Sequence, residues 1–523
     1  MTRPGGPLRR FNIFLPYSAR RDGTGLQKRA GVLMGRIGPT WQYSPARRIS
    51  QVLCLALFCY LFFRVAWPYA TVFSGSVLED KEWLPVETFL WLDPLAGLST
   101  AIAARQYNIA LLGMCGILLV CILSPRGFCG YICPLGTLID GFDWLIGKRI
   151  RRFRPKRAGW WVHMKYYLLT AVLISSVFGV LLSGYVAAIP VLTRGFLFTG
   201  GRIQLGLAKG WIQVGPMQWS VYLSLLLLAG VFLFGLFGKR FWCRYVCPSG
   251  AVFSLFNLLR LGKRQVEATC VDCKKCIESC PFDAIRADYT TRELDCSFCQ
   301  TCGGVCPTQA INFTTRWNHD KLKESKGGPV VSRSMSRRGF IISGLAGVGA
   351  ATGTRMGLAD ASRPERVLLR PPGSVAESEF LDLCVRCGQC IKVCPGPVLH
   401  PAGLEAGLEA LWTPVVVPSH AGCHQDCNFC TQVCPTQAIR PLSLEEKHRT
   451  PMGLAVINTK TCLPHTGECD CRLCFEECEA AGYHAIQMRS IKLDLGDIPP
   501  GVFSEEELEA MSSIEAPFVD ADA

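Results

Sequence analysis

The chain has 523 residues, enough for three or four domains, and 49% of them are hydrophobic. A formal net charge of +14 would fit a nucleic-acid-binding protein only if the basic residues formed one patch, and they are instead divided among segments between apolar stretches. The 29 cysteines are too many and too regularly spaced for chance. Composition therefore argues against a nucleic-acid partner and points to a membrane protein with functional cysteines.

A basic cytoplasmic segment, residues 1–48, precedes a predicted four-span membrane domain, residues 49–262. A bilayer core of roughly 30 Å sets the length of each span. The spans are expected near Ile49–Phe73, Tyr107–Leu123, Lys165–Ile189 and Trp219–Gly238. Lys and Arg are abundant before the first span, between the second and third, and after the fourth, and scarce in the other two loops. The positive-inside rule therefore predicts a multi-pass protein of the bacterial inner membrane with a cytoplasmic amino terminus.

Two similar elements, RGFCGYICPLG from Arg126 and RFWCRYVCPSG from Arg240, follow the second and fourth spans. Cysteines at positions i and i+4 lie on one helical face, so two pairs at the same depth could present their thiolates to one another. We expect a metal, cluster or redox-thiol site at the cytoplasmic surface, formed by Cys129, Cys133, Cys243 and Cys247. The alternative is a capping turn in which Pro and Gly end each span and the cysteines are only small buried residues. Plain packing is expected of the cysteines inside spans, Cys54, Cys59, Cys115 and Cys121.

Residues 263–317 carry CVDCKKCIESCP, ending at Pro281, and, fourteen residues further on, DCSFCQTCGGVCP, beginning at Asp295. Two such motifs side by side are typical of a bacterial dicluster ferredoxin, in which the fourth cysteine of each motif ligates the neighbouring cluster. One predicted 4Fe-4S cluster takes Cys270, Cys273, Cys276 and Cys306, and the other takes Cys296, Cys299, Cys302 and Cys280. A pair of zinc ribbons is the alternative, but zinc sites group their cysteines two and two.

A polar linker, residues 318–335, leads to a twin-arginine segment, residues 336–361. SRRGFI, followed by a weakly hydrophobic run rich in Gly and Ala, is the address that the Tat exporter reads. Ala359-Asp360-Ala361 supplies an A-x-A cleavage pattern. A basic linker beside a buried helix is the alternative. Export of a folded domain would suit iron–sulfur clusters, which are inserted in the cytoplasm.

Residues 362–523 are expected to form a periplasmic multi-cluster ferredoxin domain. Two proline-terminated motifs come first, with Cys384, Cys387, Cys390 and Cys394, then Cys423, Cys427, Cys430 and Cys434. A looser group follows, with Cys462, Cys469, Cys471, Cys474 and Cys478. A disulfide framework is the alternative in an oxidising compartment, but the CxxCxxxCP runs argue against it. Ferredoxin pairing needs an even number of motifs, so we expect a further CxxCxxC motif beyond Ala523.

The fold class expected is an α-helical membrane protein with four spans, and a candidate fifth at the twin-arginine segment. Bacterial dicluster-ferredoxin domains of the α+β type are expected on both sides of the membrane. Haem is not expected, because the sequence has no CxxCH and the predicted spans contain no histidine.

The spans, the two CxxxCP elements and the dicluster motifs resemble the NapH family, membrane quinol dehydrogenase subunits of periplasmic nitrate reductase systems. The part after Ser336 is similar to the NapG family of Tat-exported ferredoxin-type proteins. Its cues are SRRGFI, CVRCGQCIKVCP, MGLAVI at Met452 and the cysteines from Cys462 onward. Related pairs accompany methylamine dehydrogenase maturation, and the membrane half is also similar to polyferredoxins of cytochrome oxidase assembly.

The resemblance implies a particular cluster pairing in the exported half. One cluster would take Cys423, Cys427, Cys430 and Cys478, and the other would take Cys462, Cys471, Cys474 and Cys434. Cys469 would be surplus, and Cys384, Cys387 and Cys390 would lack a fourth ligand, with Cys394 a free thiol.

The resemblance also implies quinol oxidation at the membrane quinol pool, with electrons passing to a periplasmic reductase or cytochrome. The alternative is a maturation factor that supplies electrons for assembling a copper or quinone-cofactor enzyme.

Overall fold

The computed structural model describes residues 44–64, 84–107, 109–147, 153, 160–211, 214–215, 217–317, 336–355, 368–453, 455–480, 482, 484–492 and 513–519. The chain divides into two compact units, Met1–Lys447 and His448–Ala523. Residues 1–43, the linker 318–335 and the A-x-A pattern at 359–361 lie outside the described residues.

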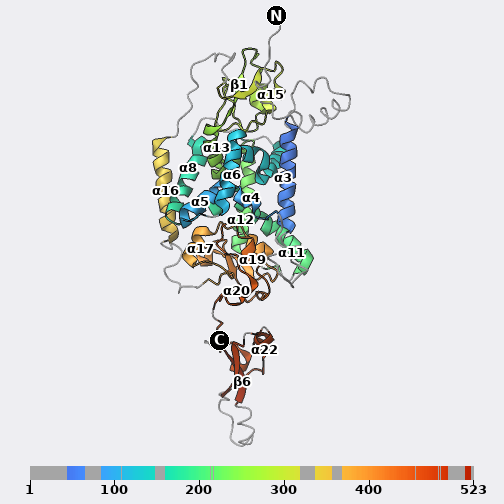
Figure 1. Ribbon diagram of the computed structural model, residues 1–523, viewed down its shortest axis with the longest axis vertical. Coiled ribbons are helices and arrows are strands. Elements are labelled where there is room, and N and C mark those ends of the chain that lie inside the picture. The colour runs from blue at the N-terminus through green and yellow to red at the C-terminus, as the bar shows by residue number, and fades with distance from the viewer. Residues whose placement is uncertain are drawn as a thin grey trace, which may run out of the picture. The chain divides into compact units, whose positions relative to one another are not determined.

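The helical part of the first unit extends from residue 44 to residue 259 and consists of α-helices joined by short 3-10 and π turns (Figure 1). Two of its helices, Pro45–Arg64 and Trp219–Leu236, are long and apolar enough to cross a membrane. Shorter apolar helices accompany them, and the number of spans and their sidedness stay predictions. The first half contains α3 (Pro45–Arg64), α4 (Thr88–Trp91), α5 (Pro94–Ala104), α6 (Ile109–Leu123), η3 (Phe128–Ile132), α7 (Pro134–Gly147) and η4 (Trp160–His163). The second half contains α8 (Met164–Val177), α9 (Ser183–Val186), α10 (Ala188–Phe196), η5 (Leu197–Gly201), α11 (Arg202–Lys209), α12 (Trp219–Leu233), η7 (Phe234–Leu236), η8 (Trp242–Val246), α13 (Pro248–Phe256) and η9 (Asn257–Leu259).

The third predicted span, Lys165–Ile189, is not one helix, so that prediction was wrong. Helix α8 ends at Val177, and Gly179 follows in the left-handed conformation with φ 79°. The amide of Val180 donates to the carbonyl of Ser175 at 3.0 Å, which closes a Schellman motif. The chain then turns into α9 and α10.

The two CxxxCP elements fold alike. Each begins with a π-helical turn, η3 or η8, in which the second cysteine amide donates to a carbonyl five residues back: Cys133 to Phe128 at 2.8 Å, Cys247 to Trp242 at 2.9 Å. The proline after that cysteine opens the next helix, α7 or α13, because its missing N–H and fixed φ suit the first helical position. The capping-turn alternative supposed that this proline ends a span. In the structure it starts a helix instead.

The first iron–sulfur module, residues 262–317, is an antiparallel ribbon with two short helices. Strands β1 (Gly262–Val266) and β2 (Ile311–Thr315) pair from Gly262↔Thr315 to Val266↔Ile311. The helices α14 (Lys275–Ser279) and α15 (Thr301–Val305) each hold the third cysteine of a motif.

The second iron–sulfur module, residues 368–447, follows helix α16 (Arg337–Arg355), which packs along α8. Its ribbon pairs β3 with β4 antiparallel, from Leu399↔Val416 to Pro401↔Pro414. The elements are α17 (Glu377–Leu383), α18 (Gln389–Val393), β3 (Leu399–Pro401), η10 (Leu404–Ala406), β4 (Pro414–Val416), α19 (Phe429–Gln432) and α20 (Leu444–His448).

The two modules contact opposite ends of the helical part. Lys165, at the start of α8, pairs with the first module, while Arg386 of the second donates to the carbonyl of Leu181, beyond the other end of α8. Ser220, near the start of α12, also meets the second module.

The second unit has its own small fold. Helices α21 (Leu463–Thr466) and α22 (Leu473–Ala480) precede β5 (Ile486–Lys492), which pairs antiparallel with β6 (Ser513–Val519) from Ile486↔Val519 to Lys492↔Ser513. Residues 520–523, which precede the position of the expected further motif, lie outside the described residues.

Candidate iron–sulfur and electron-transfer sites

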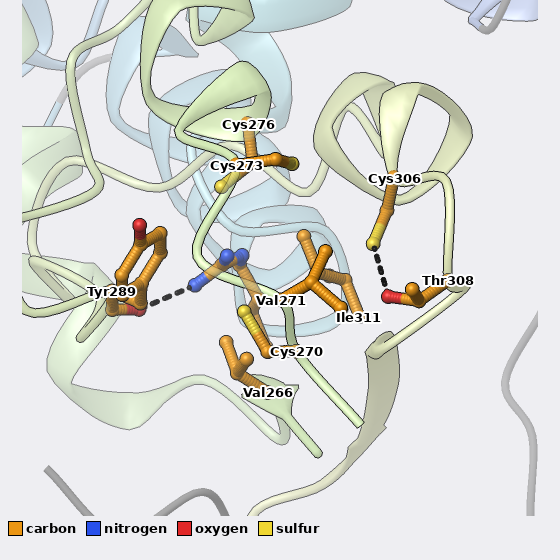
Figure 2. A pocket seen from close by; sticks show the side chains of 10 residues that line it. Val266, Cys270, Val271, Cys273, Cys276, Tyr289, Cys306, Thr308 and Ile311 are labelled. Atoms are coloured by element: carbon orange, nitrogen blue, oxygen red, sulfur yellow. Dashed lines mark hydrogen bonds between the residues drawn. The ribbon is translucent and has the colours of Figure 1, made fainter. Parts of the chain in front are cut away.

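The first module brings four of the predicted ligands to the wall of one cavity (Figure 2). Arg264, Tyr289 and Ile311 line the same cavity. Sulfur atoms and a buried guanidinium therefore face a common space, which suits a thiolate-ligated group of net negative charge. The four cysteines are Cys270, Cys273, Cys276 and Cys306.

The backbone between the cysteines has a shape that recurs in three motifs. Two residues of each CxxCx segment adopt left-handed φ angles between 49° and 77°, although only one of the six is glycine. Alternating right- and left-handed residues turn successive amides inward, as in the backbone nests that surround many iron–sulfur clusters. These residues are Asp272 and Lys274, Phe298 and Gln300, and Arg386 and Gly388.

The second predicted group of the first module also comes together. Cys280 lies within electrostatic reach of the other three expected ligands, and its sulfur accepts a hydrogen bond from the Ala284 amide at 3.3 Å. These other ligands are Cys296, Cys299 and Cys302. The fourth cysteine of one motif therefore joins the first three of the next, as in dicluster ferredoxins.

Burial favours the protonated form of several of these thiols when no metal is bound. Burial raises the pKa of the Cys276 thiol to about 11, and the nearby charge of Arg264 only partly offsets it. In the second module burial likewise raises the pKa of the Cys427 thiol to about 11. Metal binding at these sites therefore releases protons.

Among the described residues, no group of three or more His, Cys, Asp or Glu side chains could hold a single metal ion. A 4Fe-4S cubane has a different requirement, because each thiolate binds its own iron at a separate corner. The nest geometry, the buried cation and the thiols around one cavity fit that larger group.

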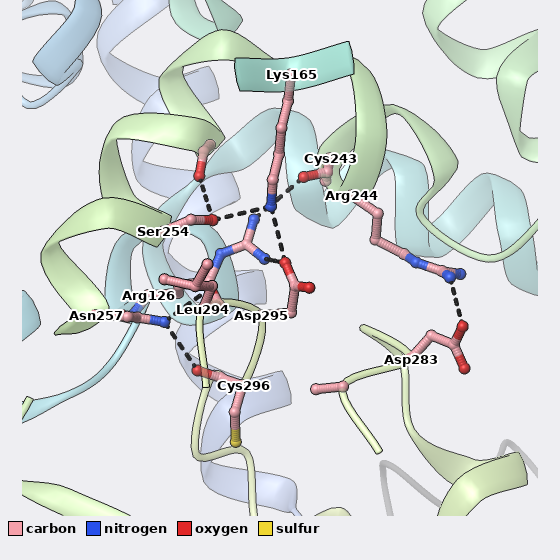
Figure 3. Close-up of polar contacts among 12 residues, drawn as sticks. Arg126, Lys165, Cys243, Arg244, Ser254, Asn257, Asp283, Leu294, Asp295 and Cys296 are labelled. Carbon is pink, nitrogen blue, oxygen red and sulfur yellow. Dashed lines mark hydrogen bonds and ion pairs between the residues drawn. The ribbon is translucent and has the colours of Figure 1, made fainter. Parts of the chain in front are cut away.

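An ion-pair cluster joins the first module to the helical part (Figure 3). The carboxylate of Asp295 accepts from Lys165 at 2.8 Å and pairs with Arg126 at 3.5 Å, and Arg244 pairs with Asp283 at 2.8 Å. Although burial alone would raise the pKa of the Asp295 carboxyl, the charges of Lys165 and Arg126 hold that pKa below its ordinary value of 3.8.

A single aromatic ring sits among three arginines at the same junction. Phe282, which follows Cys280 and Pro281, has guanidinium groups of the helical part 4.8 to 5.7 Å from its ring centre. Cation–π attraction and burial of the ring fix the chain directly after a predicted ligand. The arginines are Arg47, Arg126 and Arg240.

The two CxxxCP elements are joined by reciprocal hydrogen bonds. Arg126 donates to the carbonyl of Cys243 at 3.1 Å, and Arg240 donates to the carbonyl of Cys129 at 2.8 Å. Cys129 and Cys243 both lie within electrostatic reach of Cys133.

Both also lie within reach of Cys247. The four thiols expected to converge are therefore neighbours in the structure. The two elements pack closely here, since a Cβ at Gly136 or Gly250 would lie 3.4 Å from the other element's guanidinium, in van der Waals contact.

One position breaks this symmetry. Arg240 pairs with Asp140 at 2.5 Å, but Ser254 stands where the repeat would place the matching acid for Arg126. Asp295 of the first module supplies a carboxylate to Arg126 instead. The missing acid therefore creates a docking point for the first module.

The second module groups its cysteines differently from the pairing that the resemblance implied. Cys434 lies within electrostatic reach of Cys384, Cys387 and Cys390. Cys394 lies near Cys423, Cys427 and Cys430.

The first two exported motifs therefore pair with each other inside one unit, and Cys394 is not isolated. This grouping differs from the expected sets, which joined Cys434 to the Cys462 group and Cys478 to the Cys423 group. Sequence spacing alone did not show that Cys384–Cys394 and Cys423–Cys434 share one hydrophobic core.

Two buried arginines attach the second module to the helical part. Arg386, between Cys384 and Cys387, donates to the carbonyl of Leu181 at 2.8 Å, and Arg194 of α10 donates to the carbonyl of Arg386 at 3.0 Å. Arg194 Nη2 and Arg386 Nε have no hydrogen-bond partner among the described residues. Two buried positive charges beside Cys384 and Cys387 fit an anionic group at those thiols.

Aromatic packing and a close backbone approach complete this junction. The indole of Trp412 donates to the carbonyl of Ser220 at 2.6 Å and lies 3.9 Å beneath the guanidinium of Arg194. A Cβ at Gly184 would come within 2.8 Å of the carbonyl oxygen of Val385, so only glycine lets the cysteine loop lie this close.

In the second unit, Cys462 and Cys471 lie within electrostatic reach of Cys474. The sulfur of Cys478 accepts from the Ala485 amide at 3.2 Å, as Cys280 does from Ala284. Cys469 is exposed. The unit therefore has a group of three thiols and a fourth cysteine that accepts a backbone amide. In the two modules of the first unit, a motif of this kind occurs together with a second one.

Sequence reasoning did not single out Arg194, Arg386, Phe282 or Asp295. Arg386 is the only one with a visible signal, an arginine between two cysteines. The others depend on contacts between segments more than a hundred residues apart.

Comparisons with known proteins match several parts of the chain. A family model described as a 4Fe-4S binding domain matches residues 109–152 and 220–267, which contain both CxxxCP elements, and a second 4Fe-4S binding domain matches residues 265–286. The ferredoxin-type protein NapH of Haemophilus influenzae is 30% identical over 290 residues, which cover 52% of this chain and 90% of that protein. The chain belongs to the NapH family.

The NapH-like part does not account for the whole sequence. The ferredoxin-type protein NapG of Escherichia coli is 40% identical over 137 residues, 26% of this chain and 57% of that protein. The methylamine utilization ferredoxin-type protein MauM of Methylophilus methylotrophus is 36% identical over 146 residues, 26% of this chain and 60% of that protein. The chain is thus a fusion of NapH-like and NapG-like ferredoxin-type parts. No solved structure matches it.

Proposed function

We propose that this iron–sulfur electron-transfer protein oxidises quinol at the bacterial inner membrane and passes the electrons to a reductase or cytochrome in the periplasm. The observation that carries the proposal is the placement of cysteine groups at both ends of the helical part, with the four CxxxCP thiols within it. Quinol gives up two electrons and two protons on oxidation to quinone. When bound, 4Fe-4S clusters supply one-electron carriers with a wide range of potentials.

Four ligand sets are proposed in the first unit. The first module holds one cluster with Cys270, Cys273, Cys276 and Cys306, and another with Cys280, Cys296, Cys299 and Cys302. The second module holds one with Cys384, Cys387, Cys390 and Cys434, and another with Cys394, Cys423, Cys427 and Cys430. In the second unit, Cys462, Cys471 and Cys474 form a triad.

Iron analysis tests the revised pairing directly. Replacing Cys434 with Ser in the whole chain should remove about four irons and four sulfides, because it completes the set around Cys387. Cys469→Ser is the matched control and should leave the iron content unchanged. Equal losses in the two variants, or none in either, would show that the pairing is wrong.

The four CxxxCP thiols are proposed as the redox or metal site that links quinol to the clusters. Their mutual approach and the paired arginines Arg126 and Arg240 support this role, since positive charge stabilises thiolates. The test is anaerobic addition of duroquinol to the purified whole chain. Cluster absorbance should bleach in the parent chain, whereas Cys129→Ser should keep its iron and stay oxidised. Normal reduction in that variant would assign the cysteines to packing.

A second candidate function is electron supply for maturing another enzyme, which the likeness to MauM favours. The two functions differ in the acceptor. Under the first, cells lacking the chain lose a periplasmic reduction but keep cofactor maturation. Under the second, they accumulate an enzyme with an unfinished cofactor.

A further inference from the structure

We propose that α16, the twin-arginine segment, is a permanent fifth membrane span that is locked on α8 and keeps the second module joined to the helical part. The inference rests on the membrane topology proposed above. Its starting point is that this segment, read in the sequence as an export signal with a cleavage pattern, packs along a helix of the same chain.

The direction of α16 fits a crossing. Its amino-terminal end lies beside Tyr167, close to the start of α8, where the Ser336 amide donates to the Tyr167 hydroxyl at 3.3 Å. Further along, Gly347 meets Ala171. The two helices therefore run parallel, and α16 carries the chain from the end of α8 that contacts the first module toward the end that contacts the second. Its 19 residues span about 28 Å, close to the roughly 30 Å of a bilayer core.

The face of α16 toward α8 is built for close approach. A Cβ at Gly347 would lie 2.6 Å from the carbonyl oxygen of Ala171, and one at Gly339 would lie 2.7 Å from the Tyr167 ring. Ser343 and Ala351 on α16 are buried. Small residues that let backbones meet are how helices associate in lipid, where burial of apolar surface gives no driving force.

The remaining face of α16 suits lipid. Its large apolar side chains are exposed, and no other described residues cover them. They are Phe340, Ile341, Ile342 and Leu345. Small and polar residues dilute the rest of the helix, and α16 is not one of the two helices that are apolar enough to cross by composition alone. Close packing on α8 would supply what its composition lacks.

Glycine positions on opposite faces of α16 give a matched test of docking. Gly347→Leu must displace the α8 backbone, whereas Gly349→Leu enters open space. The whole chain carries a protease site within residues 318–335, a tag at each end, and a photoreactive residue at position 343 or 342. After illumination and cutting, a covalent link between the two fragments reports contact of α16 with α8.

We expect cross-linking from position 343 and not from 342, and about tenfold less of it when Gly347→Leu is added, because overpacking opens the contact. Gly349→Leu should leave the yield unchanged. Without the inserted protease site, the membrane fraction should hold one chain with both tags. Recovery of the second module as a soluble periplasmic fragment, equal cross-linking from both positions, or equal effects of the two glycine variants would overturn the proposal. Each of these readouts is independent of quinol oxidation, so a failed electron-transfer assay would not decide it.

Discussion

The first and second iron–sulfur modules are docked on the same helical part in chemically different ways. The first uses carboxylates against cations, with Asp295 facing Lys165 and Arg126. The second uses buried arginines against carbonyl oxygens and rings, with Arg386 and Arg194 as the main donors. At the first junction Lys165 and Arg126 are buried, but their carboxylate partner Asp295 is partly exposed, whereas at the second junction the buried guanidiniums depend on carbonyl oxygens and rings and cannot lose them without a large penalty. The comparison predicts a tighter junction at the second module.

The thiols explain why arginine can be buried at the second junction. Arg386 lies between two predicted ligands, and a cluster with its thiolates would balance the charge that no described carboxylate offsets. In the first module, Arg264 lies beside Cys276 and Cys302 in the same way. Each module thus has a buried cation beside its thiols. In the second module that cation, Arg386, also donates a hydrogen bond to the helical part.

The largest effect is expected at the second junction. Arg386→Ala removes the hydrogen bonds to Leu181 and Glu409 and should cost about 3 to 5 kcal/mol of stability, together with iron from this module. Arg440→Ala, an exposed arginine of the same module, should change stability by about 0.5 kcal/mol at most. Thermal unfolding and iron content of the purified whole chain measure both. A mild Arg386 variant would remove the asserted difference between the junctions.

A smaller effect is expected at the first junction. Asp295→Asn leaves Lys165 and Arg126 without their carboxylate and should cost about 2 to 3 kcal/mol. Protection of the first module from limited proteolysis should fall, while its iron content stays the same. Glu293→Gln, which alters a more exposed pair with Arg260, is the control. It should cost at most about 1 kcal/mol, the usual upper value for a surface ion pair. An Asp295 variant that is as harmful as Arg386→Ala would contradict the comparison.

The smallest effect concerns pH. The pKa of Asp295 is lowered in the folded chain, so its carboxylate stabilises docking at every pH above the ordinary value of 3.8 and loses this contribution only as the pH falls through the lowered pKa. The stability difference between the parent chain and Asp295→Asn should therefore stay constant from about pH 8 to pH 5. Thermal unfolding across that range measures it, and a difference that shrinks on mild acidification would show that another group carries the docking.

Local patterns in the sequence indicate which cysteines share a loop, but they do not show which distant loops come together. The spacing of Cys270 to Cys306 is enough to expect one shared cavity, because both motifs lie in one short module. The grouping of Cys434 with the Cys384 motif was not expected because it depends on which segments share a core, and that core brings together residues from Phe380 to Ile439. The prediction of the third span as one helix failed for a local reason, since Gly179 ends α8 in the middle of an apolar stretch.

The docking residues were not predictable in this way. The sequence around Asp295 does not indicate a contact with Arg126. The repeat places Ser254 where Arg240 has its acid, Asp140, but this difference becomes meaningful only when the structure shows that each arginine binds the other CxxxCP element.

The most direct test of the account is electron transfer through the purified whole chain in sealed lipid vesicles that contain quinol. Ferricyanide, which does not cross the bilayer, is supplied outside, and its bleaching is followed without oxygen. We expect the parent chain to reduce ferricyanide at the expense of quinol, and Cys129→Ser and Cys434→Ser to reduce little of it. Quinol that stays reduced while dithionite readily bleaches the clusters would contradict the central claim that this chain links the quinol pool to an acceptor outside the membrane.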